Sequence, residues 1–270
     1  MELKECNEGV DFTKYNTLSE YHDFLMRGAG SLDTATTYQK AVDYLLQDQI
    51  LIDCRDLDVQ KVLEKLRKIK YKNQYSKYKN AFLKFCEFQG IRLSNDVLLE
   101  MQFMNLDKVK KRRKLKQRNL KDITNKIKVT RDEKLKLSYE ALLQTGLRVS
   151  ELSQITKEDC KIINENLFIS IVGKGQQKQT VSISKKDNPR LFDNLLKLID
   201  ETKESKKVFY SRNYLQKKAI EKGFACHDLR RAHAKVLFEE TQDINQVMKS
   251  LRHKNEKTTK IYLNSKIDIN

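Results

Sequence analysis

The chain of 270 residues is 39% hydrophobic and 34% charged, a mix too apolar for a disordered chain and too polar for a membrane protein. No apolar run approaches the roughly 20 residues that cross a bilayer, and the acidic start lacks a signal-peptide pattern, so we expect a cytoplasmic protein without a membrane partner. Lysine and arginine outnumber aspartate and glutamate by 54 to 37, and the net charge of +17 indicates a polyanionic partner, nucleic acid above all.

The N-terminal part is predicted to be helical throughout, because apolar residues recur at helical spacing. Five helices are expected, over residues 17–27, 31–45, 59–69, 74–88 and 95–104. Phe24, Leu45 and Phe85 are assigned to the core that these helices share. The pattern predicts an N-terminal helical domain over residues 1–106, of which the first 58 carry a net charge of −7.

A dense run of positive charge, KVKKRRKLKQRNLK, occupies residues 108–121, within a segment (107–127) that we expect to link two domains. Clustered like charges repel one another, which favours a solvated linker. The same charges favour a segment that lies against DNA phosphates, and both interpretations can hold together. The residues predicted to contact DNA are Lys108, Lys110, Lys111, Arg112, Arg113 and Lys114.

The second predicted domain, residues 128–270, is mostly helical with one small antiparallel β-sheet, so the whole chain is expected to be mainly α. Thr130 and Glu133 have the spacing of a capping box for a helix that ends before Gly146. Residues 167–184 alternate apolar and polar side chains around a glycine-bearing turn, which is typical of a β-hairpin. Further helices are expected over residues 189–201, with proline at the first position, and over 213–222, 229–240, 244–251 and 257–263.

The five cysteines are odd in number and scattered, and they form neither a CxxC pair nor a Cys/His cluster at the spacing of zinc ligands. We interpret them as reduced packing residues and predict no metal site. These residues are Cys6, Cys54, Cys86, Cys160 and Cys226.

The second domain also contains short segments that carry candidate catalytic residues. Arg148 follows the helix-ending glycine in TGLRVSEL, and Glu151 comes three residues later, which places both side chains on one helical face. Lys174 lies in VGKGQQKQ, at the turn of the predicted hairpin. An arginine, a carboxylate and a turn lysine are individually common, so their order along the chain matters more than any one of them.

Three more segments follow in the C-terminal third of the chain. His227 and Arg230 of HDLRRAH are three residues apart and should project from one helical face. His253 lies in SLRHKNEKTT, and Tyr262 comes nine residues later in TTKIYL. Together with the two earlier segments, the order is arginine, lysine, histidine with arginine, histidine and tyrosine.

These segments resemble the tyrosine recombinase family, which includes the phage integrases and Xer-like enzymes. Its catalytic domains carry an arginine in a TGLRxSEL context, a lysine in a GKG hairpin, an HxLR motif, an LxH motif and a tyrosine near the C-terminus. The resemblance covers residues 130–263, while the N-terminal helices are similar to the family's core-binding domain in pattern and size. It implies a site-specific recombinase that acts on double-stranded DNA as a homotetramer, through a 3′-phosphotyrosyl intermediate and a Holliday junction, without metal, ATP or another cofactor.

The resemblance also implies a role for each residue. Tyr262 is the expected nucleophile, and His227 is the expected base that takes its proton. The guanidiniums of Arg148 and Arg230 are expected to hold the phosphate oxygens, because their forked donors match that geometry. Lys174 would protonate the leaving 5′ hydroxyl.

Two further residues complete the expected site. His253 would donate a hydrogen bond to the phosphate, and Glu151 would brace the arginine and histidine side chains. Arg252 stands where the family often has glycine, so we expect a differently shaped turn before His253. Only eight residues follow Tyr262, so the long C-terminal helix that many relatives dock on a neighbouring subunit is expected to be short or absent.

Two other functions remain open from the sequence. A catalytically silent DNA-binding regulator could be built on the same fold, and it would bind DNA without cleaving any site. A type IB topoisomerase-like enzyme would use the same phosphotyrosine chemistry to relax supercoiled DNA without sequence preference.

Overall fold

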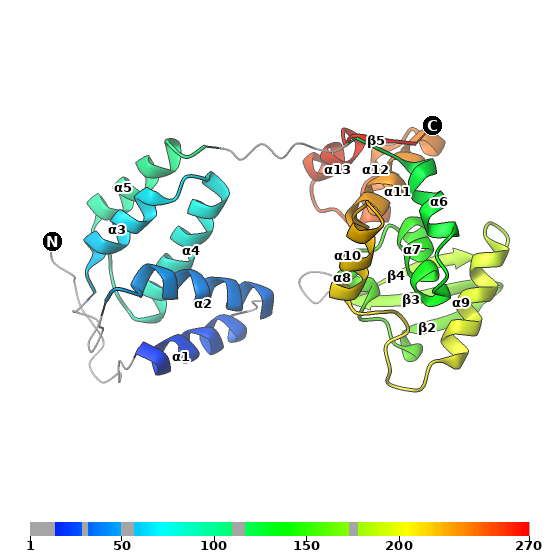
Figure 1. Cartoon of the computed structure of the whole chain (residues 1–270), viewed down its shortest axis with the longest axis horizontal. Coiled ribbons are helices and arrows are strands. Elements are labelled where there is room, and N and C mark those ends of the chain that lie inside the picture. Colours follow the sequence, from blue (N-terminus) through cyan, green and yellow to red (C-terminus); the bar gives the residue numbers. More distant parts are fainter. Residues whose placement is uncertain (1–13, 29–31, 50–56, 110–116, 173–177, 270) are drawn as a thin grey trace. The chain divides into compact units, whose positions relative to one another are not determined.

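The computed structural model describes residues 14–28, 32–49, 57–109, 117–172 and 178–269. Contacts within the chain divide it into two compact units, Met1–Arg113 and Lys114–Asn270 (Figure 1). The expected fold class, mainly α with one small antiparallel sheet, is confirmed. Among the helices of these described ranges, none has the length and apolar character of a membrane-crossing segment.

Helices make up the described part of the N-terminal unit, and the five expected helices are confirmed to within a few residues at either end. Their bounds are α1 (Lys14–Arg27), α2 (Leu32–Leu46), α3 (Val59–Lys68), α4 (Lys72–Phe88) and α5 (Asn95–Leu106). Asp58 and Ser94 begin α3 and α5, because each side chain accepts a backbone hydrogen bond from the first turn.

The core of the N-terminal unit is built around aromatic side chains. Tyr21 and Phe85 meet edge to face with their ring centres 5.4 Å apart, and the Tyr21 hydroxyl donates a hydrogen bond of 2.7 Å to the carbonyl of Ala81. Leu45 and Phe85 are buried, as expected, while Phe24 is partly buried against the same cluster. The hydrogen bond satisfies the one polar group that this tyrosine brings into the core.

The C-terminal unit contains a three-stranded sheet surrounded by helices. Its helices are α6 (Leu120–Lys128), α7 (Glu133–Thr145), α8 (Val149–Leu152), α9 (Pro189–Glu201), α10 (Arg212–Glu221), α11 (Cys226–Thr241), α12 (Ile244–Leu251) and α13 (Glu256–Leu263). Its strands are β1 (Arg118–Asn119), β2 (Cys160–Ile163), β3 (Asn166–Val172), β4 (Lys178–Ser184) and β5 (Ile267–Asp268).

The predicted hairpin is formed by β3 and β4, which pair antiparallel from Asn166 with Ser184 to Val172 with Lys178. A third strand that we did not expect, β2, pairs antiparallel with β3 and gives the order β2-β3-β4. Helices α7 and α9 both contact β4 (Figure 1). The turn that contains Lys174 lies outside the described residues.

The capping box expected at Thr130 and Glu133 is wrong. Asp132 begins α7, and its side chain accepts a hydrogen bond of 2.9 Å from the backbone N–H of Leu135. The Thr130 hydroxyl instead donates to the carbonyl of Lys126 at 2.9 Å, in the last turn of α6. The helix therefore begins two residues after the predicted cap, at an aspartate, and either residue type can fill the capping role.

Part of the segment that we assigned to a linker is regular structure. Asn119 accepts hydrogen bonds from the first N–H groups of α6, and Ile123 and Ile127 on this helix are each 2% exposed. Strand β1 pairs in parallel with β5, close to the C-terminus of the chain. The described residues from Arg118 onward thus belong to the C-terminal unit.

Helix α11 is the centre of the helical layer, because it contacts α7, α10, α12, α13 and β5. It begins at Cys226, three residues before the predicted start at Leu229. The early start has a consequence for the site, because His227 and Arg230 both lie in the first turns of this helix. The remaining expected helices, including α9 with Pro189 at its first position, are confirmed.

Candidate active site

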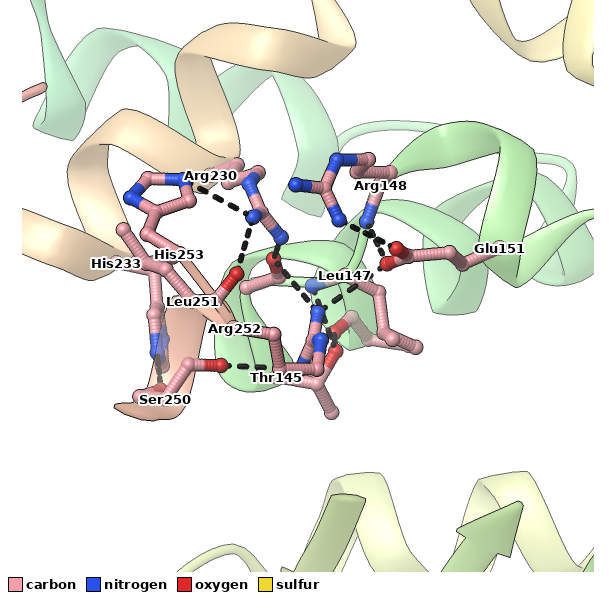
Figure 2. A network of polar contacts seen from close by, with 12 residues as sticks. Thr145, Leu147, Arg148, Glu151, Arg230, His233, Ser250, Leu251, Arg252 and His253 are labelled. Carbon is pink, nitrogen blue, oxygen red and sulfur yellow. Dashed lines mark hydrogen bonds and ion pairs between the residues drawn. The ribbon is translucent and has the colours of Figure 1, made fainter. Parts of the chain in front are cut away.

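Arg148 and Glu151 form the first part of the site. Arg148 precedes the short helix α8, and its backbone N–H donates to Oε2 of Glu151 at 2.7 Å. Its side-chain Nη1 contacts Oε1 of the same carboxylate at 2.6 Å (Figure 2). The side chain of Glu151 is only 5% exposed, whereas that of Arg148 is 36% exposed. Glu151 therefore holds Arg148 and leaves one side of the guanidinium open to solvent. Its expected contact with a histidine is not among the contacts of the described residues.

Arg230 is fully buried and lies between the C-terminal ends of helices α7 and α12. Its Nη1 donates to the carbonyl of Gly146 after α7, and its Nη2 donates to the carbonyl of Leu251 at the end of α12, 2.5 Å away (Figure 2). The same Nη2 lies 3.3 Å from Nε2 of His253. Arg230 thus joins two loops and His253 through one planar group that has five N–H donors.

Tyr262 on α13 is 8% exposed, and its hydroxyl is hydrogen-bonded to Nε2 of His227 at 2.7 Å. Its ring meets the rings of His227 and His253 edge to face, with centres 5.1 Å and 4.8 Å apart. The Arg230 guanidinium carbon lies 5.9 Å from the centre of the tyrosine ring. Four of the predicted catalytic residues therefore meet at one place, although they come from α11, α13 and the loop between α12 and α13.

The hydrogen-bond partners of His253 determine which of its nitrogens carries the proton. Its Nε2 faces an arginine donor, so Nδ1 donates to Thr259 Oγ1 at 3.0 Å. Nε2 of His227 is hydrogen-bonded to the Tyr262 hydroxyl, which can donate or accept. Burial, together with nearby arginines, lowers the pKa of both histidines to about 4. Both rings are therefore neutral at pH 7, and the low pKa of His227 makes it a weak base.

The arginines keep their charge despite burial. Burial, followed by repulsion from Arg148, lowers the pKa of Arg230 to about 10, which leaves it protonated at neutral pH. Burial alone would raise the pKa of Glu151, but hydrogen bonds from Arg148 and the charges of Arg252 and Arg148 lower it overall. The site thus combines a buried anion with three guanidiniums and has a positive net charge, as a phosphate site requires.

Of the predicted DNA-binding residues, only Lys108 lies within the described residues. Its ammonium donates to the carbonyl of Arg67 at 2.8 Å and lies 5.1 Å from the centre of the Tyr75 ring. The residues from Lys110 to Lys114 lie outside the described residues, as does the catalytic candidate Lys174. For all of these, the assigned role stays a prediction.

Two residues near the site were given no role in the site by the sequence analysis. Asp228, with its side chain 7% exposed, accepts from the N–H of Ala225 at 2.9 Å, from Arg231 Nη1 at 3.1 Å and from Arg118 Nη1. It fixes the first turn of α11, where His227 follows Cys226. Its position three residues after Ala225 has the spacing of a capping interaction, which is the only sequence signal for it.

Arg252 is the second, and it corrects an expectation. It has φ +55° and ψ +43°, so the turn before His253 keeps the left-handed geometry that glycine normally provides. We expected a differently shaped turn because the family often has glycine there. The side chain of Arg252 instead contributes contacts that a glycine could not make, among them an ion pair with Glu151.

Gly146 separates α7 from Arg148 and has φ +61°. A Cβ atom at this position would lie 2.5 Å from Cδ2 of His233. Gly146→Ala is therefore expected to lower the free energy of unfolding by about 2–5 kcal/mol, through left-handed strain and overpacking together. Urea unfolding followed by circular dichroism measures this change.

Gly223→Ala is the matched control for that prediction. Gly223 also has a positive φ, of +85°, but its nearest contact would be the flexible end of Lys126 at 3.3 Å. Only the backbone strain of about 1–2 kcal/mol is expected there. Equal losses in both variants would show that the close approach of His233 to Gly146 does not matter.

The same His233 leads to a pH-dependent prediction. It donates from Nδ1 to the carbonyl of Leu143 at 3.0 Å and accepts at Nε2 from the Ser250 hydroxyl at 2.8 Å, and burial lowers its pKa to about 4. The unfolded chain, with a histidine pKa near 6.5, then binds more protons than the folded chain between about pH 6.5 and pH 4. The stabilisation that neutral His233 provides is therefore complete above about pH 6.5, and it decreases as the pH falls through this window.

The test measures the unfolding free energy at about pH 7 and about pH 5 for the unmodified chain and for His233→Gln. Between these two pH values the unmodified chain is expected to lose more stability than the variant, by on the order of 1–2 kcal/mol. Glutamine keeps a donor and an acceptor but does not titrate. Parallel pH dependences in the two proteins would contradict the assignment of a neutral, bridging His233.

Comparison with known proteins adds independent observations. Residues 113–267 match the model of the phage integrase family, a range that covers more than half of the chain and contains every catalytic candidate from Arg148 to Tyr262. The chain is 27% identical over 139 residues to tyrosine recombinase XerC of Neisseria meningitidis serogroup B (strain ATCC BAA-335 / MC58), and to the same extent to that of Neisseria gonorrhoeae (strain ATCC 700825 / FA 1090). These matches cover 46% of this chain and 45% of each relative, so the chain spans about half the length of the curated relatives it matches.

Solved structures share the fold over nearly the whole chain. A lambda integrase tetramer bound to a Holliday junction has a TM-score of 0.65 at 16% identity. The match covers 95% of this chain and 78% of the integrase chain. XerH site-specific recombinase bound to its difH substrate has a TM-score of 0.59 at 18% identity and covers 91% of this chain and 80% of its own. At these identities the likeness concerns the fold, and the family-model match supplies the relationship. The chain belongs to the phage integrase family.

Proposed function

We propose that this chain is a site-specific DNA recombinase that cleaves DNA with Tyr262 and becomes joined to a 3′ phosphate. The observation that carries the proposal is the hydrogen bond of 2.7 Å between the Tyr262 hydroxyl and Nε2 of His227, beside the Arg230 guanidinium. A tyrosine attacks a phosphate after its hydroxyl loses a proton, and Nε2 of His227 lies within hydrogen-bond distance to accept it.

The proposed step is an exchange of one phosphoester bond for another. The bond from Tyr262 Oη to phosphorus forms while the bond from phosphorus to the 5′ oxygen breaks, and the tyrosine proton passes to Nε2 of His227. Negative charge grows on the nonbridging oxygens, where the guanidiniums of Arg148 and Arg230 stabilise it. His253 donates to the same phosphate from Nε2, which requires its proton to move there from Nδ1, where Thr259 accepts it in the structure. Lys174 protonates the leaving 5′ oxygen.

The phosphotyrosyl bond retains the energy of the broken linkage, so the 5′ hydroxyl of a second strand can restore the DNA backbone without ATP. Four copies of the chain act on two double-stranded DNA sites and exchange the strand pairs in turn through a Holliday junction. The net charge of +17 and the fold shared with the lambda integrase tetramer on such a junction support this assembly.

Each part of the chain has a place in this proposal. Residues 1–106 act as the core-binding domain, and residues 128–270 act as the catalytic domain. The basic segment between them, with Lys108 and the residues from Lys110 to Lys114, contacts DNA phosphates, which is supported by its charge. The reaction takes place in the cytoplasm, on the nucleoid in a prokaryotic cell.

A covalent-capture experiment tests the proposal. The purified chain is incubated in EDTA with fragmented, lightly nicked genomic DNA from its source organism, because a nick beside the cleaved bond releases a short strand and traps the covalent intermediate. Protein-linked DNA is collected after denaturation and sequenced. The linked peptide is identified by mass spectrometry.

The expected result is DNA from one or a few discrete loci, joined through its 3′ phosphate to the peptide that contains Tyr262. DNA binding without any adduct would contradict the proposal and support the silent regulator. Adducts spread over the genome without a shared sequence would contradict site specificity and support a topoisomerase-like enzyme. An adduct on a different residue would overturn the assignment of Tyr262.

A further inference from the structure

Arg252 is in an unfavourable backbone conformation. A residue with a side chain loses about 1–2 kcal/mol in the left-handed region, where glycine is unstrained, and Arg252 has φ +55°. Its side chain is nevertheless 8% exposed, so it does not simply extend into solvent. An arginine in this conformation needs compensating contacts, and its surroundings supply them.

The guanidinium of Arg252 connects the end of α12 to helix α8 and to the residue that follows α7. Nη1 donates to the carbonyl of Ser250 at 3.0 Å, while Nη2 lies 3.2 Å from Oε2 of Glu151 and 3.5 Å from the carbonyl of Gly146 (Figure 2). Ser250 is in the last turn of α12, and Glu151 is in α8. One side chain thus bridges the segment before His253 to the segment that carries Arg148.

The carboxylate of Glu151 is shared between two arginines. Its Oε1 holds Nη1 of Arg148 at 2.6 Å, and its Oε2 holds Nη2 of Arg252 at 3.2 Å. Without Arg252, a nearly buried carboxylate would face Arg148 alone and neutralise its charge. With Arg252 present, the group of three keeps a net positive charge, and the carboxylate is held in one orientation by partners on both sides.

Exposure distinguishes the two arginines. The Arg148 side chain is 36% exposed and can reach a phosphate from solvent, whereas the Arg252 side chain is 8% exposed and is directed at two carbonyls and a carboxylate. Nε of Arg252 is buried and has no hydrogen-bond partner among the described residues. An anion, the Glu151 carboxylate, already holds the Arg252 guanidinium, whereas the hydrogen bonds of the buried Arg230 among the described residues go to two carbonyls and a histidine. These contacts favour an internal role for Arg252 over direct phosphate binding.

We propose that Arg252 is a positioning residue for strand cleavage, which acts through Glu151 to fix the Arg148 guanidinium and does not itself touch DNA. This rests on the proposed function of the site. Arg252→Gly removes the side chain and also relieves the left-handed strain, so the turn before His253 is retained. Misplacement of one phosphate-binding group is expected to lower the cleavage rate about 10²-fold.

The test measures single-turnover cleavage of a nicked duplex that carries a locus obtained by covalent capture, at saturating DNA. Lys249→Gln is the matched control, because Lys249 is an exposed residue on α12, three residues before Arg252, and its replacement removes the same charge. Arg252→Gly should bind DNA as tightly as Lys249→Gln but cleave about 10²-fold more slowly. Cleavage at the rate of the unmodified chain, or a loss confined to affinity, would overturn the proposal.

A double-mutant cycle identifies the route of the effect. If Arg252 acts through Glu151, then Arg252→Gly should cause no further loss of rate in a Glu151→Gln background. Full additivity of the two losses would overturn the proposal, because it would mean that Arg252 acts independently of Glu151.

The same cycle, measured by urea unfolding, does not depend on activity. Non-additive effects of the two substitutions on unfolding are expected for a direct ion pair, and additive effects would overturn the proposed contact. If the unmodified chain forms no DNA adduct, the proposed function fails, and the unfolding cycle still shows whether Arg252 and Glu151 are coupled.

Discussion

Replacement of Tyr262 by phenylalanine is expected to abolish the covalent protein–DNA adduct and to lower strand cleavage by at least about 10⁴-fold. Phenylalanine keeps the ring that packs against His227 and His253 and removes only the hydroxyl, which is the attacking group. The lost hydrogen bond to His227 should cost about 1 kcal/mol of stability, too little to unfold the domain. DNA affinity should be unchanged, and gel-shift and adduct assays on the same captured site measure both quantities.

Tyr210→Phe is the matched control for this substitution. The Tyr210 hydroxyl also makes one side-chain hydrogen bond, to Asp132 Oδ2 at 3.0 Å, within the same unit. This variant should form the adduct at the rate of the unmodified chain. An adduct that persists in Tyr262→Phe would mean that another group attacks the phosphate.

Replacement of Arg230 by lysine is expected to lower the cleavage rate by about 10²–10³-fold, the usual loss when one positioned donor of a transition state is removed. Arg230 is fully buried and donates to the carbonyls of Gly146 and Leu251 while it faces His253. A single ammonium cannot serve two carbonyls and a phosphate in one plane. The variant should also be less stable, because a buried carbonyl left without a donor costs about 1–3 kcal/mol.

Single-turnover cleavage at saturating DNA separates the catalytic effect of Arg230→Lys from weaker DNA binding, and the unfolding free energy shows whether the variant is folded under assay conditions. Arg190→Lys is the control, because Arg190 on α9 has a side chain that is 61% exposed, and its Nη2 lies 2.5 Å from Oε1 of Glu140 on α7. It should cleave normally. A normal rate for Arg230→Lys would remove this guanidinium from the proposed reaction.

Most helices of this protein follow from local patterns in the sequence. Pro189 supplies the fixed backbone angle that suits the first position of α9, and Gly146 supplies the left-handed residue that ends α7. The apolar spacing of α12 predicted its bounds, 244–251, without error. Such signals act within a few residues, so they can be recognised without knowledge of the rest of the fold.

Local patterns failed where the deciding contact is distant. The charge of residues 108–121 led us to assign residues 107–127 to a linker. Ile123 and Ile127 of that segment instead bury one face of α6 in the C-terminal core. Strands β1 and β5 contain two residues each, and they pair although they lie at opposite ends of the unit. Neither strand is long enough to show an alternating pattern, which is the sequence signal of a strand.

The sequence by itself determined the fold class and the order of the motifs, because these depend on residue type and spacing. The resemblance to the tyrosine recombinases supplied the catalytic candidates, and their roles stay predictions. Only the tertiary structure decided how the candidates meet. The packing of α13 on α11 brings Tyr262 to His227, 35 residues away, and the packing around α12 brings Arg252 to Glu151, 101 residues away. Contacts over such separations arise when helices bury their apolar faces together, and no spacing within one segment encodes them.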